Sequence, residues 1–268
     1  MTRLACAVAV SLLATLMLAP PDAHGEEERT TVRVGGYAFP PYVGGDVVDR
    51  GATREILDAL NAHQDRFRFR FVLTAARRRY QDFRHDQFDV MLFERPEWGW
   101  GERGISVDTL SPVVADGEVY VARAEAATSQ AYFDTIADKR IAGFIGYHYG
   151  FADGEGDPDV LRERFDIALT SDHSANIEKV LNGEAELAIV AESFLDLYLD
   201  RNPAVRGKLT VSETWDQRYR LGGVVDPGGP IGASQLEDLL RGLHATGDLE
   251  AVLRPFGLAR RIVLDAKG

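Results

Sequence analysis

The stretch VRVGGYAFPPYVGGDVVDRGATREILDAL, residues 32–60, indicates a strand, a rigid aromatic loop and a helix in succession. The β-branched residues at its start are typical of a strand. Pro40 and Pro41 end that strand, because consecutive prolines remove backbone donors and fix φ. From Ile56 onward apolar residues recur at helical spacing, and Thr53 is the expected N-cap. Open α/β sheets bind ligands outside the carboxyl ends of their strands, so the loop predicts a small-molecule site.

The same alternation of strand and helix occurs twice along the chain. Residues 32–93 indicate strand, helix, strand, helix, strand, and residues 140–190 repeat this order at similar length. In the first run, residues 66–71 alternate arginine with phenylalanine, so one face of that strand is expected to be exposed to solvent. This favours an edge position, with the strands ordered second, first, third. The pattern predicts two similar α/β lobes, each with a Rossmann-like sheet.

Near the C-terminus the predicted elements are a strand and a helix. Residues 221–225 are rich in β-branched side chains and glycine and predict a strand. The helix that follows has leucines on one face and is expected to begin with a capping box formed by Ser234 and Glu237.

The N-terminus has the pattern of an export signal. Arg3 is followed by an uncharged apolar run at residues 4–18, and cleavage is expected after Gly25, so that residues 1–25 are removed. The run is too short for a confident membrane span. The single cysteine, Cys6, falls inside the signal, so the mature chain would have no thiol. This suits an oxidising compartment, and a periplasmic location is expected.

Charge and motifs exclude several classes of function. The chain has 30 basic and 42 acidic residues, a net charge of −12, which argues against nucleic acid or anionic lipid as a partner. Residues 99–104 match G-x-G-x-x-G, but the segment after them reads as extended, whereas the dinucleotide motif opens a helix. The acidic residues 153–157 lack the glycine and distal glutamate of an EF-hand and are expected to form a solvated loop. No cofactor and no metal site are predicted.

The loops that follow the predicted strands carry aromatic rings, arginines and carboxylates. Because the carboxyl ends of parallel strands point the same way, these loops are expected to converge on one cleft. Rings and charges of both signs suit a polar, partly zwitterionic ligand. The candidate ligand-binding residues are Phe39, Tyr42, Arg77, Arg78, Glu94, Trp98, Arg103, Tyr147, His148, Tyr149 and Glu192.

The chain resembles the family 3 extracellular solute-binding proteins over almost all of residues 30–258. The loop Phe39-Pro40-Pro41-Tyr42 is similar to the family's opening P-P-F loop. Arg103 stands nine residues before Pro112, the spacing between the family's carboxylate-binding arginine and the proline of its F-S-x-P-Y motif. Residues 187–192, LAIVAE, resemble the family's D-A-V-V-x-D, although leucine replaces the first aspartate and glutamate the last.

The resemblance implies a type II periplasmic binding protein fold, with two Rossmann-like lobes joined by a two-crossover hinge. Lobe 1 is expected to comprise residues 26–121 and 223–268, and lobe 2 residues 122–222, with crossovers near 120–125 and 218–225. Ligand would bridge the lobes and favour hinge closure. By resemblance, Arg103 would bind a carboxylate and Glu192 an ammonium group, while Phe39 and Tyr42 would stack on the ligand.

The resemblance further implies a non-catalytic monomer that delivers its ligand to an inner-membrane permease of an ABC transporter or to a membrane sensor. The alternative is a periplasmic enzyme similar to cyclohexadienyl dehydratases, with Glu94, His148 or Glu192 as general acid or base. Arg77, Arg78 and Arg79 at a helix start favour a ligand with at least one carboxylate. The competing interpretation is that these arginines only offset the acidic surface.

Overall fold

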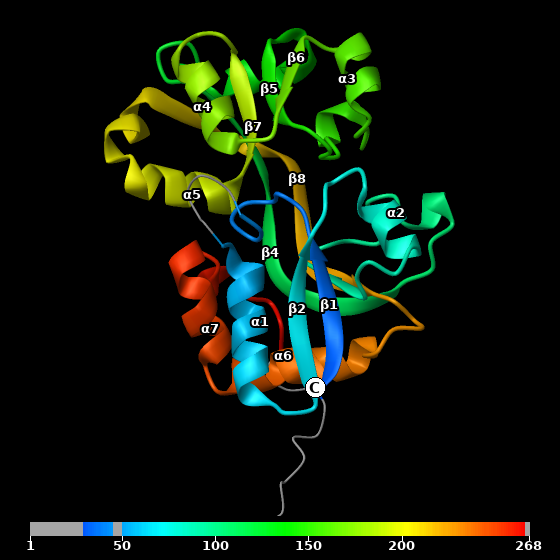
Figure 1. Ribbon diagram of the computed structural model, residues 1–268. Coiled ribbons are helices and arrows are strands. Elements are labelled where there is room, and N and C mark those ends of the chain that lie inside the picture. Colours follow the sequence, from blue (N-terminus) through cyan, green and yellow to red (C-terminus); the bar gives the residue numbers. More distant parts are fainter. Residues whose placement is uncertain (1–28, 45–49, 266–268) are drawn as a thin grey trace, which may run out of the picture.

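The computed structural model describes residues 29–44 and 50–265, which fold into two α/β lobes, one above the other in Figure 1. Within these ranges eight strands form one sheet, in the order β2-β1-β3-β8-β4-β7-β5-β6, that runs through both lobes. The strands are β1 (Thr30–Gly36), β2 (Phe67–Leu73), β3 (Val90–Leu92), β4 (Asp108–Arg123), β5 (Ile141–Phe144), β6 (Ile167–Thr170), β7 (Leu187–Ala191) and β8 (Leu209–Val225). The α-helices are α1 (Ala52–His63), α2 (Arg79–Arg84), α3 (Pro158–Arg164), α4 (His173–Leu181), α5 (Glu192–Arg201), α6 (Ala233–Ala245) and α7 (Asp248–Leu253). The predicted two-lobe α/β architecture is confirmed.

Lobe 1, the lower lobe in Figure 1, is built on the parallel strands β2, β1 and β3. The predicted order of second, first and third strand is confirmed. The edge position of β2 explains its alternating sequence, because Phe67 and Phe69 are buried whereas Arg68 and Arg70 are exposed. The helices α1, α6 and α7 pack against one another in this lobe.

Lobe 2, the upper lobe in Figure 1, repeats this arrangement with shorter strands. Here β5 lies between β6 and β7 and pairs with both in parallel, so the second strand is again at the edge. The helix α4 packs against β5 and β7. The helix α3 is the helix expected between the first two strands of this lobe, whereas α5 has no counterpart among the elements predicted from the sequence.

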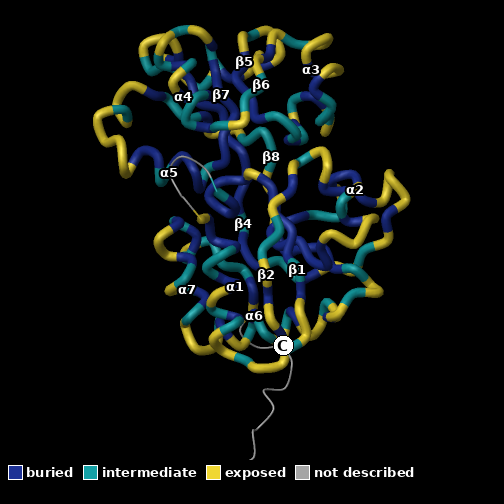
Figure 2. The backbone as a smooth tube through the Cα atoms, viewed as in Figure 1, coloured by how far each residue is buried: buried dark blue, intermediate teal, exposed yellow. Residues whose placement is uncertain are grey.

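The antiparallel strands β4 and β8 join the lobes. They pair from one end, where Asp108 opposes Val225, to the other, where Arg123 opposes Leu209. In lobe 1 the end of β8 also pairs with β3, and in lobe 2 β4 pairs with β7 from Glu118 onward. Most of β4 is buried, as Figure 2 shows, whereas residues 213–218 in the middle of β8 are exposed or half-buried. Residues 221–225 are therefore only the end of a 17-residue strand, and the expected lobe boundaries fall inside β4 and β8.

Two helix starts differ from the prediction. α1 is preceded by Gly51, whose φ is 77°, so Thr53 lies inside the helix and is not its N-cap. α6 begins one residue earlier than the expected capping box, because the backbone N–H of Gly232 donates to the side chain of Gln235. Glu237 instead accepts a hydrogen bond from the backbone of β4.

The predicted export signal and Cys6 lie outside the described residues. Among the helices of the described ranges, none has the length and apolar character that crossing a membrane requires.

Candidate functional site

A cavity of about 540 Å³, here called the outer cavity, lies between the lobes where loops that follow their strands meet. Lobe 1 contributes the start of α2 and the short helix η1 (Gly101–Arg103), and lobe 2 contributes the loop after β5. The charged side chains that line it are Arg77, Arg79, Arg103, Arg164, Glu102, Asp153, Glu155 and Asp157. Arginines and carboxylates are equal in number, so the cavity suits a zwitterion better than a simple anion.

A narrow crevice, here called the inner crevice, adjoins the outer cavity, and Gly146 and His148 line both. Its volume is only about 10 Å³. The side chains that form its walls are Tyr37, Phe39, Trp98, Glu118, Tyr147 and Gln217. The inner crevice is therefore an aromatic pocket with one carboxyl group.

Phe39 is the centre of the aromatic contacts in the inner crevice. Its ring lies 5.4 Å from that of Tyr147 in lobe 2 and 5.9 Å from that of Trp98 in lobe 1, both in edge-to-face geometry. Beside these rings the two lobes touch, because a Cβ on Gly146 would lie 2.7 Å from the Cβ of Ala76. The prediction of an aromatic cleft at the Phe39 loop thus agrees with the placement of Phe39, Trp98 and Tyr147.

Glu118 is the carboxylate of the inner crevice. It lies on β4 where that strand enters lobe 2, and it is only 2% exposed. Its Oε2 accepts a hydrogen bond from Nε2 of Gln217 at 2.8 Å. Burial, together with the nearby carboxylate of Asp216, raises the pKa of Glu118 well above its usual value.

A buried ion pair between Arg79 and Glu94 stands beside the inner crevice. Both side chains are almost fully buried, and Arg79 Nε lies 3.5 Å from Glu94 Oε1. The guanidinium group also lies over the ring of Tyr37, 4.8 Å from its centroid. Burial raises the pKa of Glu94, although Arg79 and the indole N–H of Trp100 oppose this shift. Glu94 is therefore paired within lobe 1.

The three consecutive arginines before and in α2 have different surroundings. Arg79 is buried, whereas Arg77 is exposed at the outer cavity and lies 3.7 Å from Asp157 of lobe 2. Arg78 is exposed and pairs with Asp82 of α2, away from both pockets. Arg77 and Arg78 lie in the turn before α2 and Arg79 is its first residue, so the three side chains point in different directions, and the sequence predicted an arginine at the site but not which one.

Arg103 is exposed at the outer cavity. Its guanidinium group lies 4.2 Å from the centroid of the Tyr80 ring and donates to the carbonyl oxygen of Gly99 at 3.0 Å. Within the described residues it forms no ion pair. It can therefore offer free N–H groups to an anion in the outer cavity.

His148 and the acidic loop of residues 153–157 form the lobe 2 side of the outer cavity. Burial, with the nearby charges of Arg79 and Arg103, lowers the pKa of His148 to about 4. The imidazole is therefore neutral at neutral pH. The loop was expected to be solvated, and the side chain of Asp153 is 93% exposed, while the backbone of Glu155 pairs with that of Tyr149.

A second group of contacts between the lobes, here called the hinge-side network, is centred on Asp116 of β4. The carboxylate of Asp116 accepts hydrogen bonds from the hydroxyl groups of Tyr42 and Ser193, at 2.7 and 2.5 Å. Arg261 donates to Asp116 at 3.0 Å and to Glu192 at 2.7 Å, and also pairs with Asp196. Tyr42 and Glu192 therefore lie in this network and not at the outer cavity or the inner crevice.

Tyr149 also lies away from the ligand-accessible space. Its buried hydroxyl group donates to the carbonyl oxygen of Phe144 and accepts from the backbone N–H of the same residue. This fixes the loop after β5 within lobe 2. We therefore do not propose Glu192 as the partner of an ammonium group. Tyr42, Arg78 and Tyr149 are likewise not proposed as ligand contacts.

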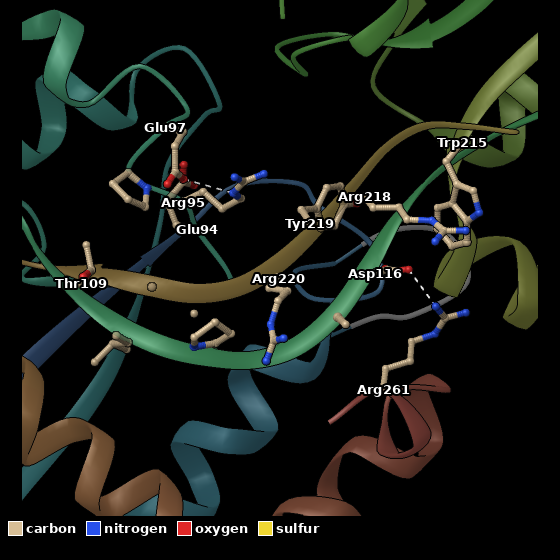
Figure 3. A pocket seen from close by; sticks show the side chains of 16 residues that line it. Glu94, Arg95, Glu97, Thr109, Asp116, Trp215, Arg218, Tyr219, Arg220 and Arg261 are labelled. Atoms are coloured by element: carbon tan, nitrogen blue, oxygen red, sulfur yellow. Dashed lines mark hydrogen bonds and ion pairs between the residues drawn. The ribbon is translucent and has the colours of Figure 1, made fainter. Parts of the chain in front are cut away.

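A larger cavity, of about 810 Å³, lies along the hinge strands, where Asp116 of β4 and Tyr219 of β8 line it together with Glu94 after β3. Figure 3 shows Arg218 and Arg220 of β8 at this cavity, with Arg261 at one end. The guanidinium group of Arg218 lies 4.6 Å from the Trp215 ring centroid. The loop after β3 lines both this cavity and the outer cavity, whereas the loops after β2 and β5 line the outer cavity.

Within the described ranges no group of three or more His, Cys, Asp or Glu side chains could hold a metal ion. Several lining residues were not predicted from the sequence: Tyr37, Glu118 and Gln217 at the inner crevice, and Arg79, Glu102 and Arg164 at the outer cavity. Residues 118 and 217 lie 99 positions apart, and only the pairing of β4 with β8 brings them together. A carboxylate flanked by β-branched and aromatic residues, as in residues 117–121, was the signal available for Glu118.

Comparison with known proteins shows the fold of this chain. No family model and no curated protein sequence matches it. Among solved structures, a substrate-binding protein of an ABC uptake transporter from Streptococcus pneumoniae with bound histidine superposes with a TM-score of 0.65 at 11% identity, over 84% of this chain and 92% of that one. Tv2483 bound to L-arginine gives 0.64 at 14% identity, over 87% and 93% of the two chains. The ancestral amino acid-binding protein AncCDT-1, a precursor of cyclohexadienyl dehydratase, gives 0.62 at 16%, over 84% and 95%. The chain thus has the type II periplasmic binding protein fold.

Proposed function

We propose that this protein is a non-catalytic receptor that binds a small, polar, amino-acid-like solute between its two lobes. The observation that carries the proposal is the outer cavity, which lies between the strand ends of both lobes and is lined by four arginines and four carboxylates. Similar structures bound to L-arginine and to histidine support it. A zwitterion would find partners of both signs there.

Arg103 is the proposed partner of the ligand's carboxylate. Its guanidinium is held by the Tyr80 ring and the Gly99 carbonyl but has no carboxylate partner among the described residues. A planar guanidinium with free N–H groups can bind a carboxylate in bidentate fashion. His148, being neutral, would add a hydrogen bond from lobe 2 without a charge. A ligand held from both lobes would favour the closed arrangement, because the open one lacks half of these contacts.

We further propose that the protein is exported to the periplasm and delivers its ligand to an inner-membrane permease or sensor. The expected signal at residues 1–25 supports export. The similarity to a substrate-binding protein of an ABC uptake transporter supports the permease. For the hinge, we propose that bending occurs between Val114 and Glu118 on β4, where pairing passes from lobe 1 to lobe 2.

A thermal-shift screen tests the proposed function. The probes are L-arginine, L-histidine, L-glutamine, L-glutamate and L-lysine, with succinate and putrescine as acid and amine controls. We expect at least one amino acid to raise the melting temperature, and Arg103→Ala to weaken its binding by about 10-fold to 100-fold. The melting temperature of unliganded Arg103→Ala should match wild type, because Arg103 is exposed.

The matched control is Arg68→Ala, an exposed arginine on the edge strand β2 far from the outer cavity. It should bind the same amino acid as tightly as wild type. Equal affinity of Arg103→Ala and wild type would contradict the proposed role of Arg103, and the absence of stabilisation by every amino acid would contradict the function itself.

An enzyme on the same scaffold remains the second candidate. The observation that favours it is a buried carboxyl group of raised pKa, Glu118, in the same crevice as a histidine of lowered pKa. Such pairs serve as acid and base in catalysis. Turnover of prephenate or arogenate by the purified protein would establish this alternative, and binding of amino acids without product would exclude it.

A further inference from the structure

Glu118 has hydrogen-bonding capacity that its surroundings in the protein do not use. The side chain is 2% exposed and accepts one hydrogen bond, from Gln217. No lysine, arginine or histidine of the described residues forms an ion pair with it. The neighbouring titratable groups are carboxyls and phenols, namely Asp116, Asp216, Tyr120, Tyr147, Tyr149 and Tyr219, with neutral His148 on the crevice wall. A buried carboxyl group in such company is stabilised by a cation.

The walls around Glu118 suit a cation as well. Phe39, Trp98 and Tyr147 surround the inner crevice, and the π faces of such rings attract a cationic group. The buried hydroxyl group of Tyr147 has no hydrogen-bond partner among the described residues. An N–H donor placed in the crevice could satisfy this oxygen and the free capacity of Glu118 together.

The size of the crevice limits which cation can enter. A volume of about 10 Å³ corresponds to roughly one water-sized group. A primary ammonium group has about this size, whereas a trimethylammonium group is several times larger. The shared lining of Gly146 and His148 connects this space with the outer cavity, where the rest of the ligand would lie.

We infer that the inner crevice is the subsite for a primary ammonium group of the ligand, with Glu118 as its carboxylate partner and Phe39, Trp98 and Tyr147 as its walls. The inference rests on the proposed function and defines its ligand class: an acid that carries a primary amine, with the amine towards the inner crevice and the carboxylate towards Arg103. Glu118, and not Glu192, then recognises the ammonium group.

Binding of the ammonium group has a consequence for protons. Without a cation, burial disfavours the charged form of Glu118 and raises its pKa. A ligand that arrives as R–NH₃⁺ favours the carboxylate and lowers this pKa, so a proton held by Glu118 passes to solvent and the complex keeps the ammonium–carboxylate pair. Binding should therefore release protons, because the pKa of Glu118 is lower in the complex than in the free protein.

Calorimetric titration tests the inference. Each amino acid that binds in the thermal-shift screen is titrated into the wild-type protein. Its 2-hydroxy acid, which lacks the amine, and its N-trimethyl derivative are titrated in separate experiments. We expect both analogues to bind at least about 100-fold more weakly. Titration in buffers of different ionisation enthalpy should show proton release for the amino acid alone. These measurements need only the wild-type protein.

The variant Glu118→Gln keeps the shape and the contact with Gln217 but removes the charge. It should bind the amino acid about 100-fold more weakly without proton release, and bind the 2-hydroxy acid within about threefold of wild type. The control is Glu213→Gln, an exposed position on the same strand β8 as Gln217, which should match wild type.

The outcomes separate the two proposals. An amino acid that binds wild type and Glu118→Gln equally, or an N-trimethyl derivative that binds as tightly as its parent, overturns the ammonium subsite and leaves the proposed function standing. A screen in which no amino acid binds overturns the proposed function, and the subsite falls with it.

Discussion

Asp116 and Glu118 lie two residues apart on β4, so their side chains are on the same face of the strand, and both are buried. Asp116 is surrounded by donors from its own chain: two hydroxyl groups and the guanidinium of Arg261. Glu118 has only the amide of Gln217. The fold thus supplies hydrogen-bond donors and a cation to the carboxylate of Asp116. It supplies a single donor to Glu118, which leaves an acceptor available to a ligand.

The contrast extends to the regions around the two residues. The hinge-side network joins the lobes through hydrogen bonds and ion pairs that converge on Asp116 and Arg261. The inner crevice joins them through ring contacts, and the ion pair between the lobes at the outer cavity, Arg77 with Asp157, is exposed and 3.7 Å long. Buried polar contacts therefore link the lobes on the hinge side, whereas ring contacts and an exposed ion pair link them on the cleft side.

The largest expected effect separates the two carboxyl groups directly. Asp116→Ala leaves the hydroxyl groups of Tyr42 and Ser193 without their acceptor and removes one carboxylate from half-buried Arg261, so it should lower the free energy of unfolding by about 3 kcal/mol or more. Glu118→Gln should change it by less than about 1 kcal/mol, because glutamine keeps the shape of the side chain and removes a charge that burial disfavours. Urea unfolding followed by circular dichroism measures both, and equal losses would contradict the contrast between the two residues.

The next effect concerns the wall of the inner crevice. His173 is fully buried, its ring packs 5.6 Å from that of Tyr147, and burial lowers its pKa to about 3. The folded state keeps this imidazole neutral, whereas the unfolded chain takes up a proton below pH ~6.5. Its contribution to stability is therefore fully present above that pH and is lost as the pH falls from about 6.5 towards 3, by about 2 kcal/mol at pH 5.

The substitution His173→Phe keeps an aromatic ring among Phe144, Tyr147 and Phe194 and removes the titration. The fall in unfolding free energy between pH 7 and pH 5 should be smaller in this variant than in wild type by about 2 kcal/mol. Urea unfolding at the two pH values gives the difference. An unchanged fall would show that His173 is not the group that titrates.

The smallest expected effect is that of the exposed ion pair across the cleft. Arg77→Ala removes its contact with Asp157, and both side chains are largely exposed. Such a pair contributes less than about 0.5 kcal/mol, and salt screens it. Unfolding by urea at low and high salt should therefore give nearly the same value for the variant and wild type. A loss comparable with that of Asp116→Ala would mean that the cleft side also holds the lobes together.

The sequence predicted the lobes because each depends on local patterns. Alternation in residues 66–71 identified an edge strand, and helical spacing after Ile56 identified α1. The length of β4 and β8 could not be predicted in the same way, because these strands follow one lobe and then the other and their burial changes along the way. The burial of charged side chains such as Arg79 could not be predicted either, because it depends on tertiary contacts.

Part of the site was predicted from the sequence, because that part also depends on local patterns. Loops after strands could be collected from topology alone, and this gave Phe39, Trp98, Arg103, Tyr147 and His148, all of which line the outer cavity or the inner crevice. The hinge contributed Glu118 and Gln217 from the middle of strands, where no loop marks a site. Glu192 follows a strand as expected, but Arg261, 69 positions later, draws it into an ion pair.

The contact between Gly146 and Ala76 limits how closely the two lobes can approach each other. The backbone at Gly146 has a φ of 84°, and any side chain there would collide with the methyl group of Ala76. Two small residues thus permit the close approach of the lobes: a Cβ at position 146 would meet the Cβ of Ala76 and force the two backbones apart. Because both residues line the outer cavity, a larger side chain at position 146 would also widen the space between the lobes where the ligand is proposed to lie.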